Sequence, residues 1–222
     1  MKMKSFVATF VLLFLASATY AQNQGTPASK AAAQVGTINI VNANSLSSPI
    51  LTADVKTASQ KDLFVSVSLE SGLYTQTQVK SKAGTQDTSV AEAGITIKVL
   101  LDGLEIALPN EVVFAKRSQT LSARLGGVIQ KAQDTNGDGT ITIDEMELTD
   151  EEIELITDTM SADTFNFIIP DVSSGTHTLT VTASIATTAQ TQTGTANATA
   201  SIGNGSLTVE EVRLIKDAPV EF

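Results

Sequence analysis

Apolar and polar residues alternate over short stretches of this chain, a period of two that is typical of β-strands with one buried face. Four such stretches stand out, and the last of them covers residues 196–202. The apolar positions of the first three are Leu63, Val65, Val67 and Leu69, then Ile95, Ile97 and Val99, then His177, Leu179, Val181, Ala183 and Ile185. The pattern predicts a mainly β protein.

Turn signals separate these stretches. Asp102-Gly103 before Leu104 predicts a hairpin, and Gly203-Asn204-Gly205 predicts a tight turn. The apolar phase slips after Val209, which predicts a β-bulge. Many short strands with few helices between them favour an antiparallel β-sandwich, either immunoglobulin-like or jelly-roll-like, over residues 37–222.

One segment breaks the β pattern. Thr149 and Glu152 have the spacing of a capping box, and Ile153, Ile156 and Met160 follow at helical spacing. We therefore expect a short helix from about Asp150 to Met160. With the loop before it, this helix forms an insertion between strands at about residues 126–163.

The N-terminus has the features of an export signal. Two lysines precede an apolar run from Phe6 to Leu15 that is too short to span a membrane as a helix, and small residues follow. We expect a signal peptide at 1–21, a flexible segment at 22–36 and no membrane span in the mature protein. The predicted location is extracellular, or periplasmic in a Gram-negative bacterium.

The charge and cysteine content narrow the classes of function. The net charge of −10, with scattered basic residues, argues against nucleic acid as a partner. The chain has no cysteine, which excludes disulfides and thiol catalysis. A bound metal ion is then a plausible substitute for covalent bracing.

Residues 134–145 read Asp-Thr-Asn-Gly-Asp-Gly-Thr-Ile-Thr-Ile-Asp-Glu, which resembles the EF-hand calcium loop. The resemblance implies that Gly139 makes the sharp turn and that oxygen atoms at alternate positions surround the ion. Thr140 would supply its carbonyl, Thr142 would act through water, and Glu145 would bind through both carboxylate oxygens. The implied ligands are Asp134, Asn136, Asp138, Thr140, Thr142 and Glu145.

The surroundings of this loop depart from the EF-hand pattern. No second loop is present to pair with Ile141, and Gly126-Gly127 together with Gln133 argue against an ordinary entering helix. The resemblance therefore implies the calcium ligands but does not imply a signalling role. We expect weak binding typical of extracellular modules, roughly 10⁻⁴–10⁻³ M, with a structural role for the ion.

A second resemblance concerns architecture alone. Residues 171–181 are similar to the corner that leads into a late strand of immunoglobulin-like and fibronectin-like sandwiches, with His177 at the position of the usual aromatic residue.

Other candidate sites are weaker. His177 with Ser173 or Ser174 and Asp171 would form a catalytic triad only among close neighbours, so a buried structural histidine is favoured. Any acidic chain offers glycosidase-like carboxylate pairs such as those among Glu92, Glu105 and Glu111. Asn197 and Asn204 begin glycosylation sequons that matter only in a eukaryotic source.

The leading interpretation is a secreted, non-enzymatic protein stabilised by calcium. An alternative is an adhesion module whose calcium shapes a surface for carbohydrate or a cell-surface protein, although tryptophan is absent and only two tyrosines are present. A secreted hydrolase is the third and least favoured interpretation.

Overall fold

The computed structural model describes residues 31–41, 48–58 and 60–214; the predicted signal peptide at 1–21 lies outside them. Within these residues, ten strands and one 3₁₀ turn follow one another. They are β1 (Ala31–Val41), β2 (Ser48–Thr57), β3 (Lys61–Ser81), β4 (Gln86–Leu101), β5 (Val112–Arg124), β6 (Val128–Ala132), η1 (Ile143–Glu145), β7 (Met146–Thr149), β8 (Glu151–Val172), β9 (Gly175–Thr191) and β10 (Thr195–Val212).

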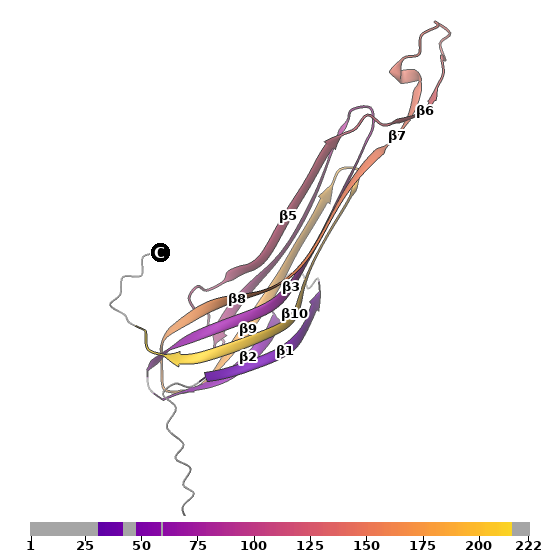
Figure 1. Cartoon of the computed structure of the whole chain (residues 1–222). Helices are drawn as coiled ribbons and strands as arrows, with labels where there is room; N and C mark the ends of the chain where they lie inside the picture. Colours follow the sequence, from indigo (N-terminus) through magenta and orange to yellow (C-terminus); the bar gives the residue numbers. More distant parts are fainter. Residues whose placement is uncertain (1–30, 42–47, 59, 215–222) are drawn as a thin grey trace, which may run out of the picture.

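Eight of the strands form two antiparallel sheets that face each other as a β-sandwich (Figure 1). One sheet has the order β1-β10-β3-β8 and the other the order β2-β9-β4-β5. Strands β6 and β7 form a separate two-stranded sheet at the far end. The expected antiparallel sandwich is confirmed.

The wide end of the sandwich, where all eight strands lie, holds an aliphatic core. Leu63, Val65 and Val67 of β3 face Ile95, Ile97 and Val99 of β4, and all six are buried. Phe167 and Ile169 of β8 complete this core with residues of β9 and β10. The period-two pattern in the sequence identified the buried face correctly, because alternate side chains of a strand point to opposite faces.

Beyond β1 and β2, the remaining six strands continue as a narrow projection (Figure 1). We call this part the shaft; it consists of residues 73–81, 86–94, 116–124, 151–159, 186–191 and 195–200. Its buried positions are mostly small or polar, as with Thr75, Thr77, Ser89 and Ala91. The shaft therefore depends on hydrogen bonds between side chains more than the wide end does.

Gln119 of β5 is the centre of that bonding. Its Oε1 accepts from the hydroxyls of Thr75 (3.0 Å) and Thr157 (2.8 Å). Its Nε2 donates to the hydroxyl of Thr77 and to the carbonyl of Leu155, both at 2.8 Å. The carboxamide thus uses its donors and acceptor fully and joins β3, β5 and β8.

Arg117 continues the same connection toward the wide end. Its Nη1 donates to the carbonyls of Leu73 (2.8 Å) and Thr157 (3.0 Å), and its Nη2 donates to the hydroxyl of Thr159. Arg117 and Gln119 thereby bond the carbonyls of Thr157 and Leu155 in β8, which is an edge strand.

The predicted helix from Asp150 to Met160 is wrong, because β8 begins at Glu151 and pairs with β3 along its length. Thr149 donates to the carbonyl of Val128 at 3.3 Å, and Glu152 forms an ion pair with Lys80 at 2.6 Å. Cross-strand partners take the place of the capping box. The insertion is accordingly shorter than 126–163 and consists of the β6–β7 hairpin with its loop.

Two turn predictions have different outcomes. Asp102 and Gly103 do form a two-residue turn, in which Leu101 and Leu104 exchange two backbone hydrogen bonds, but only a single bridge follows it. Residues 203–205 form no tight turn, because β10 continues through them without reversing its direction. The bulge lies here, between the pairs Ile202–Ser71 and Gly205–Leu69, rather than after Val209.

The N-terminal boundary also differs from the sequence analysis. Residues 31–36, expected in the flexible segment 22–36, belong to β1 and pair with β10. An edge strand is held by backbone hydrogen bonds, which require no apolar alternation. In the described part of the chain, no helix has the length and apolar character needed to cross a membrane.

We expect Gln119→Ala to lower the free energy of unfolding by about 2–3 kcal/mol, because it leaves the buried hydroxyls of Thr75 and Thr77 without partners. Urea unfolding measures the change. Gln86→Ala is the matched control, since Gln86 is exposed and its side chain donates to the hydroxyl of Ser122 at 3.0 Å. Equal effects of the two substitutions would contradict the role of Gln119.

Candidate metal site at the distal hairpin

The β6–β7 hairpin presents the predicted calcium loop at the far end of the shaft (Figure 1). The strands pair from Val128–Thr149 to Ala132–Met146, and the amide of Gln133 donates to the carbonyl of Glu145 at 3.3 Å. This pairing brings the first residue of the loop, Asp134, close to its last, Glu145. A strand precedes the loop, the last three residues of the loop form the 3₁₀ turn η1, and strand β7 follows where an EF-hand would have a helix.

Asp134 folds the first half of the loop around its carboxylate. Its Oδ1 accepts from the amide of Gly137 (2.6 Å) and its Oδ2 from the amide of Gly139 (2.8 Å). Gly139 has a φ of 83°, a left-handed conformation that other residues rarely adopt. These amide contacts, that of Gly139 foremost, lower the pKa of Asp134 below its ordinary value.

Glu145 closes the loop from the other end. Its Oε2 accepts from the amide of Thr142 at 3.0 Å. Its Oε1 accepts from the amides of Thr135 (2.9 Å) and Asn136 (3.1 Å). These contacts, with the Thr142 amide foremost, lower the pKa of Glu145 to about 2. Both end carboxylates therefore point into the loop and are ionised at neutral pH.

The middle ligands make short-range turns. The Asn136 Oδ1 accepts from the amide of Asp138 at 2.9 Å, and the Asp138 Oδ1 accepts from the amide of Thr140 at 2.7 Å. The Asn136 amide group also donates to the other oxygen of Asp138 at 3.1 Å. The side-chain oxygens of Asp134, Asn136, Asp138 and Glu145 that the sequence assigns to calcium thus accept hydrogen bonds from N–H donors of the loop itself.

The donor set suits a hard cation, although its carboxylates do not converge on a common point. Carboxylate, carboxamide and carbonyl oxygens are the ligands that calcium prefers. Within the residues that the structure describes, no group of three or more His, Cys, Asp or Glu side chains is close enough to hold a metal ion. Calcium binding would require the predicted ligand side chains to exchange hydrogen bonds with loop amides for contacts with the ion.

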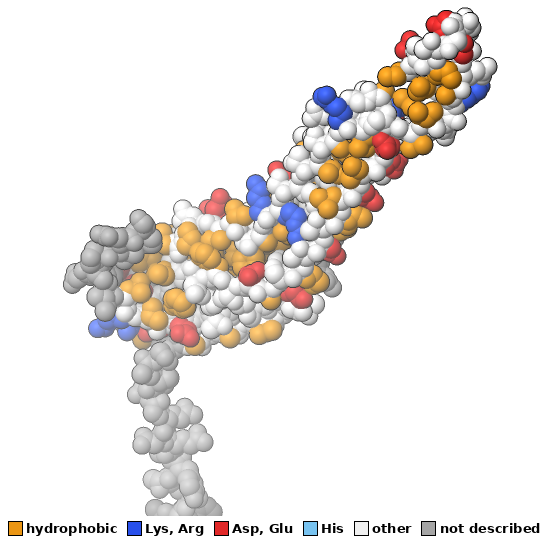
Figure 2. Space-filling view, turned by 45° about the horizontal axis from the view of Figure 1, so that its top comes forward, with side chains coloured by type: hydrophobic (Ala, Val, Ile, Leu, Met, Phe, Trp, Pro, Cys, Tyr) orange, Lys and Arg blue, Asp and Glu red, His pale blue; other side chains and the backbone are white. Residues whose placement is uncertain are grey.

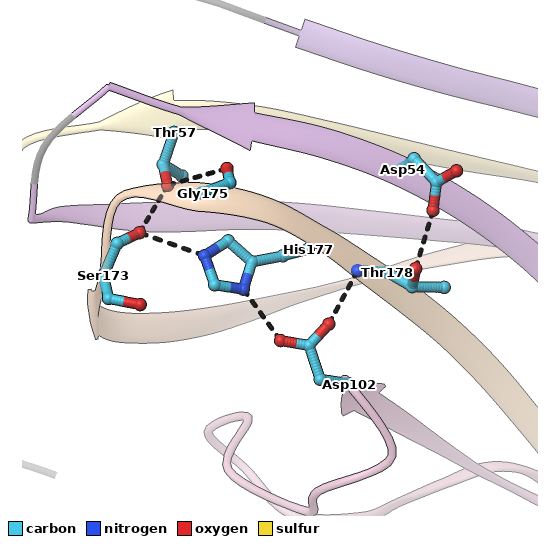
Figure 3. A network of polar contacts seen from close by, with 7 residues as sticks. All are labelled: Asp54, Thr57, Asp102, Ser173, Gly175, His177 and Thr178. Carbon is cyan, nitrogen blue, oxygen red and sulfur yellow. Dashed lines mark hydrogen bonds and ion pairs between the residues drawn. The ribbon is translucent and has the colours of Figure 1, made fainter.

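His177 lies at the opposite, wide end of the sandwich and is buried, as predicted (Figure 3). Its Nδ1 lies 2.7 Å from the Oδ2 of Asp102, and its Nε2 lies 3.0 Å from the carbonyl oxygen of Ser173. The other oxygen of Asp102 accepts from the amide of Thr178 at 2.8 Å. Both ring nitrogens are engaged, and neither contacts a serine hydroxyl.

This arrangement differs from a catalytic triad of His177 with Ser173 or Ser174 and Asp171. The partner carboxylate is Asp102, which sequence reasoning missed. The Asp102-Gly103 turn was visible in the sequence, but its position beside His177 depends on the pairing of β4 with β9. The histidine joins three segments of the wide end and has a structural role.

The candidate glycosidase carboxylates are also engaged by other groups. Glu105 and Glu111 both pair with Lys98, at 3.1 and 3.6 Å. Glu92 accepts from the hydroxyl of Ser118 at 2.8 Å in the shaft. The structure thus gives Glu105 and Glu111 a shared cation and leaves Glu92 apart from them.

The chain matches no protein-family model, no curated protein and no solved structure, so the chemistry of its own residues carries the interpretation.

The His177–Asp102 contact makes the stability of the protein depend on pH. Asp102 raises the pKa of His177 above its ordinary value of 6.5. The contact therefore stabilises fully below the unfolded-state pKa, and this contribution is lost as pH rises through the higher folded-state pKa. His177 is the chain's one histidine, so its titration can be isolated.

We expect the free energy of unfolding to fall as pH rises from about 6.5 through the higher folded-state pKa of His177, and expect His177→Gln to flatten that slope. Urea unfolding at a series of pH values measures it. Asp102→Asn should remove the same slope, because it removes the charge that favours the protonated ring. An unchanged slope in both variants would exclude this pair as its source.

Proposed function

We propose that this chain is a secreted, non-enzymatic β-sandwich protein that binds one calcium ion in the loop 134–145, and that the ion stabilises the distal hairpin. The observation that carries the proposal is the loop itself. Oxygen donors stand at alternate positions of a twelve-residue sequence, and both end carboxylates, Asp134 and Glu145, turn inward and are ionised.

The hairpin has a physical need for such a brace. None of the residues from Val128 to Asp150 is buried, so no apolar core holds the loop in place. Two-stranded hairpins alone are marginally stable in water. The same segment carries six carboxylates and one lysine, a net charge of −5 whose self-repulsion a divalent cation would reduce.

Calcium would act by joining the two ends of the loop. Asp134 follows β6 and Glu145 precedes β7, so an ion held by both would fasten the strands together. Asn136, Asp138 and the carbonyl of Thr140 would complete the oxygen shell, with Thr142 acting through water. The hairpin register then performs the alignment that a second loop provides in paired EF-hands.

We further propose that the sandwich is of the jelly-roll kind rather than immunoglobulin-like. The pairs β1–β10, β2–β9, β3–β8 and β4–β5 are nested in the sequence, as in a long hairpin rolled into two sheets. Eight strands in two four-stranded sheets support this assignment, whereas constant-type immunoglobulin domains have seven strands divided four and three.

We expect the mature protein to bind one calcium ion with a dissociation constant on the order of 10⁻⁴–10⁻³ M. Isothermal titration calorimetry measures it. Glu145→Gln should weaken binding at least about tenfold, because it removes the bidentate carboxylate. Glu147→Gln, at an exposed residue of β7 two positions further on, loses the same charge and should leave binding nearly unchanged. Equal loss in both variants would point to general electrostatic attraction only.

The structural role has a separate test by hydrogen exchange. Millimolar calcium should slow amide exchange across residues 128–149 and leave the wide end, such as 63–69, unchanged. Local exchange is the suitable measurement because the hairpin can open without unfolding of the sandwich. Identical exchange in calcium and in chelator would remove the bracing role even if the ion binds.

A further inference from the structure

Large aliphatic side chains gather on the surface around the calcium loop. Val128 and Ile129 of β6 are 54% and 55% exposed, and Ile141 and Ile143 of the loop are 45% and 69% exposed. Figure 2 shows hydrophobic side chains collected just below the acidic end of the molecule. Placing several such residues in water is unfavourable, and patches of this kind commonly mark interaction sites.

A hollow lies within this surface, which we call the tip pocket. The side chains of Ile129, Ile143, Met146 and Leu148 line it, together with the turns at 83–84 and 126–127. Its volume is about 330 Å³, enough for a large apolar side chain. The two turns are joined by backbone hydrogen bonds, from Ala83 to Gly126 at 2.8 Å and from Gly84 to Leu125 at 2.9 Å. The floor of the pocket is therefore preformed.

The charge around the pocket restricts its occupant. Residues 128–150 carry a net charge of −5, Lys82 beside the turn at 126–127 reduces the local charge to −4, and a bound calcium ion would leave about −2. A second copy of this chain, whose net charge is −10, would bring like charge against it. An anionic lipid surface would be repelled in the same way. A basic polypeptide is the partner with complementary charge.

The calcium loop forms one wall of the pocket. Ile143 lies between the proposed ligands Thr142 and Glu145, within the 3₁₀ turn, and Met146 follows Glu145 directly. Turning Glu145 toward an ion would fix the backbone that carries both apolar side chains. Occupation of the loop and the shape of the pocket are thus coupled through one short segment.

We propose that the tip pocket binds an apolar side chain of a basic polypeptide segment, and that calcium in the loop 134–145 strengthens this binding by fixing Ile143 and Met146. The calcium part rests on the function proposed above. The pocket part stands on the exposed apolar side chains and the acidic charge alone.

The test uses the full mature chain and fluorescein-labelled synthetic peptides of alternating lysine and leucine. Lysine–serine and glutamate–leucine peptides of equal length are the probes for charge alone and apolarity alone. Fluorescence anisotropy in 5 mM calcium chloride, and in chelator, gives the affinities. The variants are Ile129→Ser and Ile143→Ser. The matched control is Ile156→Ser, which alters an isoleucine of β8 that is 51% exposed and does not line the pocket.

Of the three peptides, we expect only the lysine–leucine peptide to bind well in calcium. Ile129→Ser and Ile143→Ser should each weaken its affinity at least about tenfold, whereas Ile156→Ser should weaken it less than twofold. Replacing calcium by chelator should weaken the affinity severalfold. Equal binding of the lysine–serine peptide, or equal effects of Ile129→Ser and Ile156→Ser, would overturn the pocket. The pocket proposal would also be overturned if the lysine–leucine peptide did not bind. It would be overturned as well if the pocket instead mediated dimerisation of the chain or its attachment to phosphatidylserine vesicles.

The experiments distinguish a failure of the proposed calcium coupling from a failure of the proposed calcium site. Calorimetry of Ile129→Ser with calcium should match the wild type, because this residue lies outside the loop. Peptide binding that depends on Ile129 but is the same in calcium and chelator would overturn the coupling, provided that calorimetry still detects the ion. A chain that binds the peptide but takes up no calcium would instead overturn the function proposed above.

Discussion

Two sheets stay packed only if something fills the space between them, and in the shaft the side-chain amide of Gln119 has that role. It joins β3, β5 and β8 through bonds to Thr75, Thr77, Thr157 and the carbonyl of Leu155. The aliphatic core of the wide end would hold the fold without this contact. The projection that carries the hairpin depends more on this contact, because its inward positions supply little apolar area. The candidate site thus depends on a polar network some distance from it.

The sequence predicted features whose cause is local and missed those that depend on distant pairing. The alternation of Leu63, Val65 and Val67 reports burial directly, because the side-chain period of a strand is fixed. The spacing of Ile153, Ile156 and Met160 fits a helix. In the structure, however, this segment is the strand β8 that pairs with the backbone of β3. Asp102 and His177 are 75 residues apart, so their contact depends on the β4–β9 register.

The predicted calcium loop contains features that the sequence could predict and features that it could not. Its candidate ligands lie within twelve residues, so their identity was readable without the fold. The directions of their side chains were not readable, because backbone amides compete for the same oxygens. Asp134 and Glu145 accept at least two amides each, which satisfies their charge through local hydrogen bonds. The position of the loop on a β-hairpin, instead of between two helices, also required the structure.

That competition bears on how tightly the loop can hold an ion. The amides that lower the pKa of Glu145 to about 2 already stabilise its charge, so calcium gains only the difference between its own attraction and theirs. A carboxylate satisfied in this way would lower the affinity of the loop for the ion. A site of this kind would respond to millimolar calcium rather than to trace amounts. Under the function proposed above, the same amide contacts would suit the loop to a calcium-rich surrounding, in which Ile143 and Met146 would become fixed when the ion binds.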